Sequence, residues 1–213
     1  LEVPISSTYF LMFFSYCFLI KLLGTTIVAD FSELFSIYFY SSGFSSQEMH
    51  FDDTDAAYYD WLNVMLLSTG NTQFYSSGLE ASRLEKVRFI SQHPFTYRHL
   101  SVCLSEEQQK GNCGRCAKCT RTMAELDAIG VLEKYNEVFD IEQYYNNPSY
   151  HLGYVILKSW GKDAFCSEII NEFKKRGKKI PLAAYIGAIM KWIKRGGTTK
   201  NRSREKIEEK RNT

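Results

Sequence analysis

Four cysteines carry the clearest chemical signal in this sequence. Cys113, Cys116 and Cys119 follow the spacing C-x2-C-x2-C, and Cys103 lies upstream of them. Thiolates at this spacing reach a single ion when the backbone turns tightly, and Gly114 permits that turn because glycine accepts positive φ angles. Four sulfur ligands without histidine or carboxylate suit tetrahedral Zn²⁺ in a closed, structural site. We therefore predict one structural zinc ion bound by these four thiols.

Two other uses of the four thiols stay open. A disulfide or a redox-active C-x-x-C pair is one of them, although no thioredoxin-like βαβ pattern surrounds the cysteines. An iron–sulfur cluster is the other, but the bacterial run continues with x3-C-P, whereas Thr-Arg-Thr-Met follows Cys119. Six cysteines, four of them clustered, fit a reducing cytoplasm better than a secreted disulfide scaffold. Cys17 and Cys166 have apolar neighbours, which predicts buried free thiols.

Hydrophobic periodicity predicts the elements that position the cysteines. A strand at 98–103 leads into the cluster, and a helix after Cys119 carries an apolar face and ends at Gly130. Residues 135–154 are rich in tyrosine and show no clear period. Two further helices are predicted at 163–176 and 181–195, each followed by glycine.

The part of the chain before the cysteines reads as alternating helix and strand. An uncharged strand at 34–40 is expected to be covered on both faces. The remaining predicted elements are a buried helix at 9–23, a short strand at 25–29, a helix at 52–63, a polar connector at 68–77 and a helix at 81–92.

The hydrophobic run at 9–29 raises the question of a membrane. Its uncharged part, residues 9–20, is too short to span a bilayer, and the longer stretch contains Lys21. We therefore expect a buried helix and strand in preference to a membrane segment, and no membrane partner. The chain begins with Leu1, which suggests a piece of a longer protein.

Charge is distributed unevenly along the chain. Residues 1–170 hold 12 Lys/Arg and 20 Asp/Glu, a net charge of −8, whereas residues 171–213 hold 14 and 4, a net charge of +10. The basic end is expected to be a solvated terminus, with RNA or an acidic surface as the alternative partner. Because aromatic residues are sparse there, nucleic acid would bind only weakly through residues 174–211.

Two stretches of the sequence are candidates for nucleotide binding. The loop at 41–46 follows a strand but lacks the G-K-[ST] of a Walker loop, so a plain turn is expected. Arg83 and Lys86 are three residues apart on a predicted helix that follows a polar loop. Two cations there can hold a phosphate or an acyl-adenylate, or they can form an ordinary charged helix face. His50 is expected to be a satisfied core or boundary histidine.

The order of these stretches resembles a known family. The segments SIYFYSS, LLSTGNT, SGLEASRLEKVRFI, LSVC and GNCGRCAKCTRTMAEL resemble the C-terminal half of PP-loop, adenine nucleotide alpha-hydrolase-like proteins, in particular the 7-cyano-7-deazaguanine synthase family. The resemblance covers about residues 35–130. It implies a partial doubly wound, Rossmann-like α/β sheet, four zinc ligands at Cys103, Cys113, Cys116 and Cys119, and a nucleotide or substrate cleft faced by Lys86 and Arg83.

The sequence departs from that family in one essential loop. Such enzymes use S-G-G-x-D-S to bind ATP, adenylate a carboxylate or carbonyl oxygen and release pyrophosphate, and this chain has no such loop. ATP and Mg²⁺ are therefore expected only with the missing N-terminal half. The expected function is the C-terminal part of an ATP-dependent adenylating enzyme acting on a small molecule or tRNA. The alternative is a non-enzymatic, zinc-stabilised module that binds a protein or RNA through its basic tail.

The expected domain organisation follows from these readings. It comprises a partial α/β domain at 1–102, a zinc knuckle with its following helix at 103–130, a helical C-terminal region at 131–197 and a basic tail at 198–213.

Overall fold

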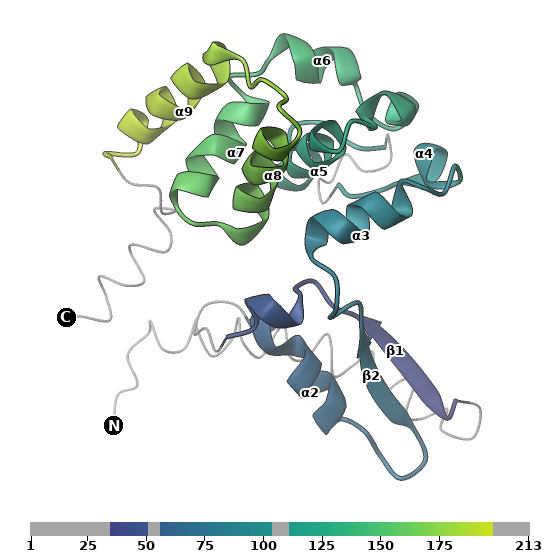
Figure 1. Cartoon of the computed structure of the whole chain (residues 1–213). Helices are drawn as coiled ribbons and strands as arrows, with labels where there is room; N and C mark the ends of the chain where they lie inside the picture. Colours follow the sequence, from purple (N-terminus) through teal and green to yellow (C-terminus); the bar gives the residue numbers. More distant parts are fainter. Residues whose placement is uncertain (1–34, 51–55, 104–110, 198–213) are drawn as a thin grey trace, which may run out of the picture. The chain divides into compact units, whose positions relative to one another are not determined.

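The computed structural model describes residues 35–50, 56–103 and 111–197 (Figure 1). The helix and strand predicted at 9–23 and 25–29, Cys17 and the tail from 198 onwards lie outside the described residues. In the described part of the chain, no helix is both long and apolar enough to cross a membrane.

The chain divides into two compact units, with the boundary between Arg83 and Leu84. The four cysteines of the cluster and all elements from α5 to α9 fall in the second unit. The domain limits expected at 102 and 130 stay predictions.

The first unit contains a two-stranded parallel sheet. β1 (Ile37–Ser41) and β2 (Gln73–Ser77) pair with Ile37 opposite Gln73 and Ser41 opposite Ser77. Parallel strands need a crossover connection, commonly a helix. Within the described residues the sheet has no further strand, so a doubly wound sheet is not confirmed. The crossover contains η1 (Ser46–Glu48), η2 (Ala56–Tyr59) and α2 (Asp60–Leu66).

The exposure of β1 corrects the expectation that both of its faces are covered. Ile37 and Phe39 are 54% and 65% exposed, whereas Tyr38 packs on Phe74 of β2 with ring centroids 5.5 Å apart. The absence of charge in the strand predicted burial on both sides. That prediction is wrong because only the Tyr38 side of the strand meets a buried ring.

β2 corrects the polar connector predicted at 68–77. Phe74 is 1% exposed and fills the inner face, whereas its neighbours Gln73 and Tyr75 are exposed. Thr72 Oγ1 donates a hydrogen bond to the Phe35 carbonyl at 2.9 Å, which fixes the start of the strand against β1. Pairing with a distant strand therefore decides the conformation of this polar sequence.

The second unit is built of helices (Figure 1). Its first helix begins at the unit boundary, and the longest connection, residues 100–116, lies between α4 and α5. They are α3 (Arg83–Ile90), α4 (Thr96–His99), α5 (Ala117–Ala128), η4 (Leu132–Tyr135), α6 (Ile141–Asn146), α7 (His151–Trp160), α8 (Ala164–Lys175) and α9 (Leu182–Lys194).

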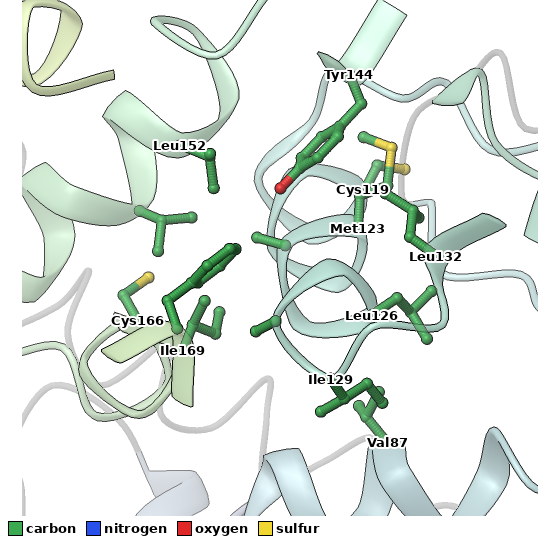
Figure 2. Packing of buried hydrophobic residues seen from close by; sticks show 14 of the residues in the cluster. Val87, Cys119, Met123, Leu126, Ile129, Leu132, Tyr144, Leu152, Cys166 and Ile169 are labelled. Carbon is green, nitrogen blue, oxygen red and sulfur yellow. The ribbon is translucent and has the colours of Figure 1, made fainter. Parts of the chain in front are cut away.

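α5 is the centre of this unit. Nine of its twelve residues are buried, so other elements pack on more than one side of the helix. Figure 2 shows Met123 and Leu126 on one side of the helix with Leu132, and Leu152 and Ile169 on the other side. Cys166 also lies in this core as a free thiol, 1% exposed, which confirms the prediction for that residue.

Local signals predicted three helices of this unit correctly. α5 ends before Gly130, whose φ is +77°. α8 is capped by Asp163, whose side chain accepts a hydrogen bond from the Cys166 amide, and α9 begins directly after Pro181. A residue that caps or ends a helix acts on its immediate neighbours, so these limits can be read from the sequence.

Two other predictions for this unit are wrong or incomplete. The strand predicted at 98–103 is absent, because residues 96–99 form the short helix α4 and residues 100–103 pair with no other strand. The stretch 135–154 contains α6 and the start of α7, which its sequence did not reveal.

Two buried carboxylates tie the end of α8 to the rest of the unit. Asp127 is 3% exposed; it pairs with Lys178 and accepts a hydrogen bond from the Tyr144 hydroxyl at 3.0 Å. Glu172 pairs with Arg176 at 2.6 Å and Arg88 at 2.8 Å. Burial alone would raise the pKa of Glu172, but the two guanidinium groups outweigh it and hold the pKa below its usual value.

Candidate metal centre

The turn before α5 brings three of the four thiols together. Gly114 has a φ of +69°, which lets the chain reverse between Cys113 and Cys116. The Cys116 amide then donates to Cys113 Sγ at 3.3 Å, and the Cys119 amide donates to Cys116 Sγ at 3.4 Å. Cys116 is also the N-cap of α5, so its sulfur accepts from the first turn of the helix. The same local hydrogen bonds therefore begin the helix and gather the sulfurs.

Asn112 positions the fourth thiol. Its side-chain oxygen accepts from the amides of Val102 and Cys103, at 2.9 and 3.2 Å. Its side-chain nitrogen donates to the carbonyls of Leu100 and Val138, at 2.8 and 3.1 Å. One carboxamide therefore holds the segment that carries Cys103 against the residue next to Cys113. The fold replaces the predicted strand at this place with a side-chain clamp.

The four sulfur atoms have a geometry that fits a metal ion. The Sγ atoms of Cys103, Cys113, Cys116 and Cys119 all lie within 4.8 Å of one another. Cys103 to Cys116 and Cys113 to Cys119 are each 4.0 Å apart, and all four residues are free cysteines. A Zn–S bond of about 2.3 Å places the sulfurs of a tetrahedral site about 3.8 Å apart. The four cysteines can therefore hold one metal ion after a small contraction.

Because the cluster is partly buried, a bound cation strongly affects the ionisation of its thiols. Cys103 and Cys119 are 1% and 0% exposed. Burial, together with the hydrogen bond and charge of neighbouring Cys116, raises the pKa of the Cys119 thiol. A bound metal ion favours the thiolate form and releases the protons, so metal binding depends on pH.

Three cationic residues close to the cysteines in sequence have different surroundings. Arg115 and Lys118 are exposed, and the Arg121 guanidinium lies over the Phe165 ring, 4.8 Å from its centroid. The amide of Gln143, oriented so that its oxygen faces Arg115, accepts from Arg115 Nη2 and Nε at 3.0 and 3.1 Å. Helix α6, which contains Gln143 and was not predicted from the sequence, thus contacts the cysteine turn.

The other sequence-predicted residues do not join the metal cluster. Arg83 and Lys86 are half-buried in the first turn of α3. The loop at 41–46 is an internally bonded turn, in which Ser42 Oγ donates to the Phe44 carbonyl and Ser45 caps η1 with Glu48. His50 is exposed, bonds the Glu48 carbonyl at 2.9 Å and stacks on Tyr58.

Asn112→Ala is expected to weaken metal binding and lower the stability of the second unit. The substitution removes the oxygen that accepts from both the Val102 and the Cys103 amide, and supporting residues of this kind typically contribute about 10–100-fold to metal affinity. Competition with a chromogenic chelator measures the affinity, and thermal unfolding measures the stability. Asn136→Ala is the control, because Asn136 is exposed and lies outside the clamp. Unchanged metal affinity in Asn112→Ala would contradict the role of the clamp.

No family model matches this sequence, and no curated protein or solved structure matches the chain. The resemblance to PP-loop proteins therefore rests on the order of the motifs alone. Function has to be inferred from the thiol cluster and from the residues around it.

Proposed function

We propose that the four thiols bind one structural Zn²⁺ and that this ion completes the fold of the second unit. The observation that carries the proposal is the convergence of four Sγ atoms within 4.8 Å on a turn with amide-to-sulfur hydrogen bonds. Four thiolates saturate a tetrahedral zinc ion, so no coordination position is left for a substrate or a catalytic water. The ion would then join the Cys103 segment to the start of α5.

We further propose that this zinc-bearing chain is the C-terminal part of an ATP-dependent adenylating enzyme of the PP-loop type. The motif order supports this reading, as does the parallel pairing of β1 and β2. Both strands lead into serine-containing turns at the same edge of the sheet, and α/β proteins bind ligands at the carboxyl ends of parallel strands.

The chemistry of such an enzyme assigns limited roles to this chain. An oxygen of the substrate attacks the α-phosphate of ATP, and pyrophosphate leaves. Lys86 and Arg83 would hold the negative charge of the phosphate or of the adenylate. The S-G-G-x-D-S loop, which holds the pyrophosphate in this family, would have to come from residues that this sequence does not contain. The substrate class would be a small carboxylate, a nucleobase precursor or tRNA.

A second function is favoured by the exposed surface of α9. Small residues of this helix, Ala184 and Ala188, are fully buried, whereas its large apolar residues face outward. A partner with an apolar groove and an acidic rim would match this surface and the basic end of the chain. In this reading the chain is a zinc-stabilised binding module without catalysis. The exposed residues are Leu182 (74%), Tyr185 (39%), Ile186 (50%), Ile189 (46%), Met190 (53%), Trp192 (39%) and Ile193 (62%).

Pyrophosphate release separates the two functions. With Mg²⁺ and a small carboxylate, a nucleobase precursor or tRNA as the attacking substrate, the natural gene product, including any residues before Leu1, is expected to release pyrophosphate from ATP, whereas the present chain alone is expected to be inactive. Lys86→Ala should lower the activity of the natural gene product, and Lys174→Ala, at an exposed lysine of helix α8, serves as the lysine control. A natural product that contains zinc but neither binds nor cleaves ATP would rule out the enzyme and favour the binding module.

A further inference from the structure

A polar cavity lies beside the cysteine turn. Its volume is about 360 Å³, within the range of small-molecule sites. Its residues come from three elements: the turn before α5, helix α6, and the junction where α6 leads into α7. None of them carries a carboxylate. They are Arg115, Gln143, Asn147, Tyr150 and His151.

The cavity is rich in hydrogen-bond donors. A guanidinium has five N–H groups, and Gln143 engages two nitrogen atoms of Arg115, so donors remain at the other end of the fork. In the described part of the chain, no carboxylate pairs with Arg115. Asn147 Nδ2 uses one of its two N–H groups on the Gln143 carbonyl at 3.0 Å, which leaves the other. The side chains that line the cavity offer a cation no carboxylate.

His151 is the most buried residue of the cavity wall. It is 1% exposed, and its Nδ1 shares a hydrogen bond with Thr120 Oγ1 at 3.3 Å. The Thr120 hydroxyl has a second acceptor in the Arg115 carbonyl at 3.5 Å; in the tautomer in which Nδ1 accepts from the hydroxyl, the ring proton is on Nε2 and available to a ligand. Within the residues that the structure describes, Nε2 has no hydrogen-bond partner. Because His151 lines the cavity, a ligand or water there can supply a partner for this atom.

The cavity wall is held rigidly against the cysteine turn. The Tyr150 hydroxyl donates to the Arg115 carbonyl at 2.9 Å, and Lys191 Nζ donates to the Tyr150 carbonyl at 2.7 Å. A Cβ atom at Gly114 would lie only 3.2 Å from the Gln143 side chain, so α6 closely approaches the turn. The Arg115 backbone is therefore fixed from two sides, which positions the guanidinium before a ligand arrives.

The field in the cavity is positive. Burial, with the charges of Lys191 and Arg115, lowers the pKa of His151 to about 4, so the ring is neutral at neutral pH. Lys191 and Arg115 thus supply the positive charge near the cavity. α5 and α7 both begin here, and the first turn of a helix adds partial positive charge.

We propose that this cavity binds the phosphate group of a small phosphate monoester. Arg115 supplies the charged donor, and Asn147 and His151 supply neutral donors from other directions. A tetrahedral anion uses donors that converge from several sides, whereas a carboxylate is satisfied by one planar pair. The volume exceeds that of a phosphate group and leaves room for an organic part. This site depends on neither ATP cleavage nor the proposed nucleotide cleft.

Isothermal titration of the metal-loaded chain in phosphate-free buffer tests the proposal, with inorganic phosphate, adenosine 5′-monophosphate and adenosine as probes. Adenosine monophosphate is expected to bind at one site per chain and to compete with inorganic phosphate, whereas adenosine should not bind. Arg115→Gln should weaken monophosphate binding about tenfold or more, because a hydrogen bond to a charged group is lost. Lys118→Gln should bind as the wild type does, since it removes an exposed cation outside the cavity wall.

Two further measurements keep the result unambiguous. Metal content is compared in all variants, because Arg115 lies between two cysteines of the cluster. Asn147→Ala, which is outside the turn, should also weaken monophosphate binding. This variant provides the test if Arg115→Gln loses metal. The proposal is overturned if adenosine binds as well as the monophosphate, or if binding does not saturate by about 10 mM ligand. Equal affinity in the wild type, Asn147→Ala and a metal-loaded Arg115→Gln would overturn it as well.

Discussion

Cys116→Ser is expected to abolish metal binding and to unfold the cysteine turn. Serine is close in size to cysteine and is a good N-cap, so the substitution keeps an acceptor for the Cys119 amide. What it removes is one metal ligand. Structural zinc sites contribute about 10–16 kcal/mol of apparent binding free energy in small peptides, and part of that free energy stabilises the fold. The loss should therefore exceed the cost of an ordinary core substitution.

The cysteine that lies in the core provides a matched control. Cys166 is 1% exposed and belongs to the packing around α5, away from the four-thiol cluster. Cys166→Ser makes the same chemical change and should cost about 1–3 kcal/mol, because it places a more polar hydroxyl in the apolar core. It should keep its metal.

Metal analysis and hydrogen exchange measure these outcomes. The wild-type chain and Cys166→Ser are expected to contain about one zinc per chain, and Cys116→Ser none. Chelation of the wild type should increase amide exchange in residues 111–122 before the rest of the second unit unfolds. A wild-type chain purified without chelators that contains neither zinc nor iron would refute the metal site. So would a Cys116→Ser variant that keeps a full equivalent of metal.

Gly187→Val is expected to be the most damaging substitution outside the metal cluster. The turn before α7 packs closely on α9, and a Cβ atom at Gly187 would overlap the carbonyl oxygen of Ser149 and lie 2.7 Å from its Cα. Both contacts are with backbone atoms, so no side-chain rotation relieves them. α9 would have to move away from the turn before α7, and the packing of its buried residues Ala184 and Ala188 would be disturbed. We expect a loss of about 3 kcal/mol or more.

Helix propensity alone predicts the opposite result for the smaller change Gly187→Ala. Alanine favours a helix interior over glycine by about 1 kcal/mol, so stabilisation is expected if no clash exists. Ala183→Val is the control for β-branching, because Ala183 is exposed on the same helix and should change stability by less than about 1 kcal/mol. Chemical denaturation of the three variants measures the differences. A Gly187→Ala variant that is more stable than the wild type would contradict the close packing of α9 on the turn that contains Ser149.

The structural environment of several residues could not be inferred from their neighbours in sequence. Asn112 was recognised only as part of the run before Cys113, yet its side chain bonds the backbone at Leu100, Val102, Cys103 and Val138. His151 lies in a tyrosine-rich stretch without a helical period. Its burial depends on contacts with Tyr144 and Thr120, which belong to other elements. These roles appear only when distant segments meet.

The sequence by itself determined the features that depend on neighbouring residues. The spacing of Cys113, Cys116 and Cys119 with Gly114 defines the turn, and caps such as Asp163 and Pro181 define where helices begin. Only the tertiary structure decided which polar stretch becomes a strand and which predicted strand becomes a helix. β2 exists because β1 supplies hydrogen bonds, and residues 100–103 are held by Asn112 without a partner strand. Hydrogen bonds within one helical turn are encoded locally, whereas strand pairing and side-chain clamps need a partner from elsewhere in the chain.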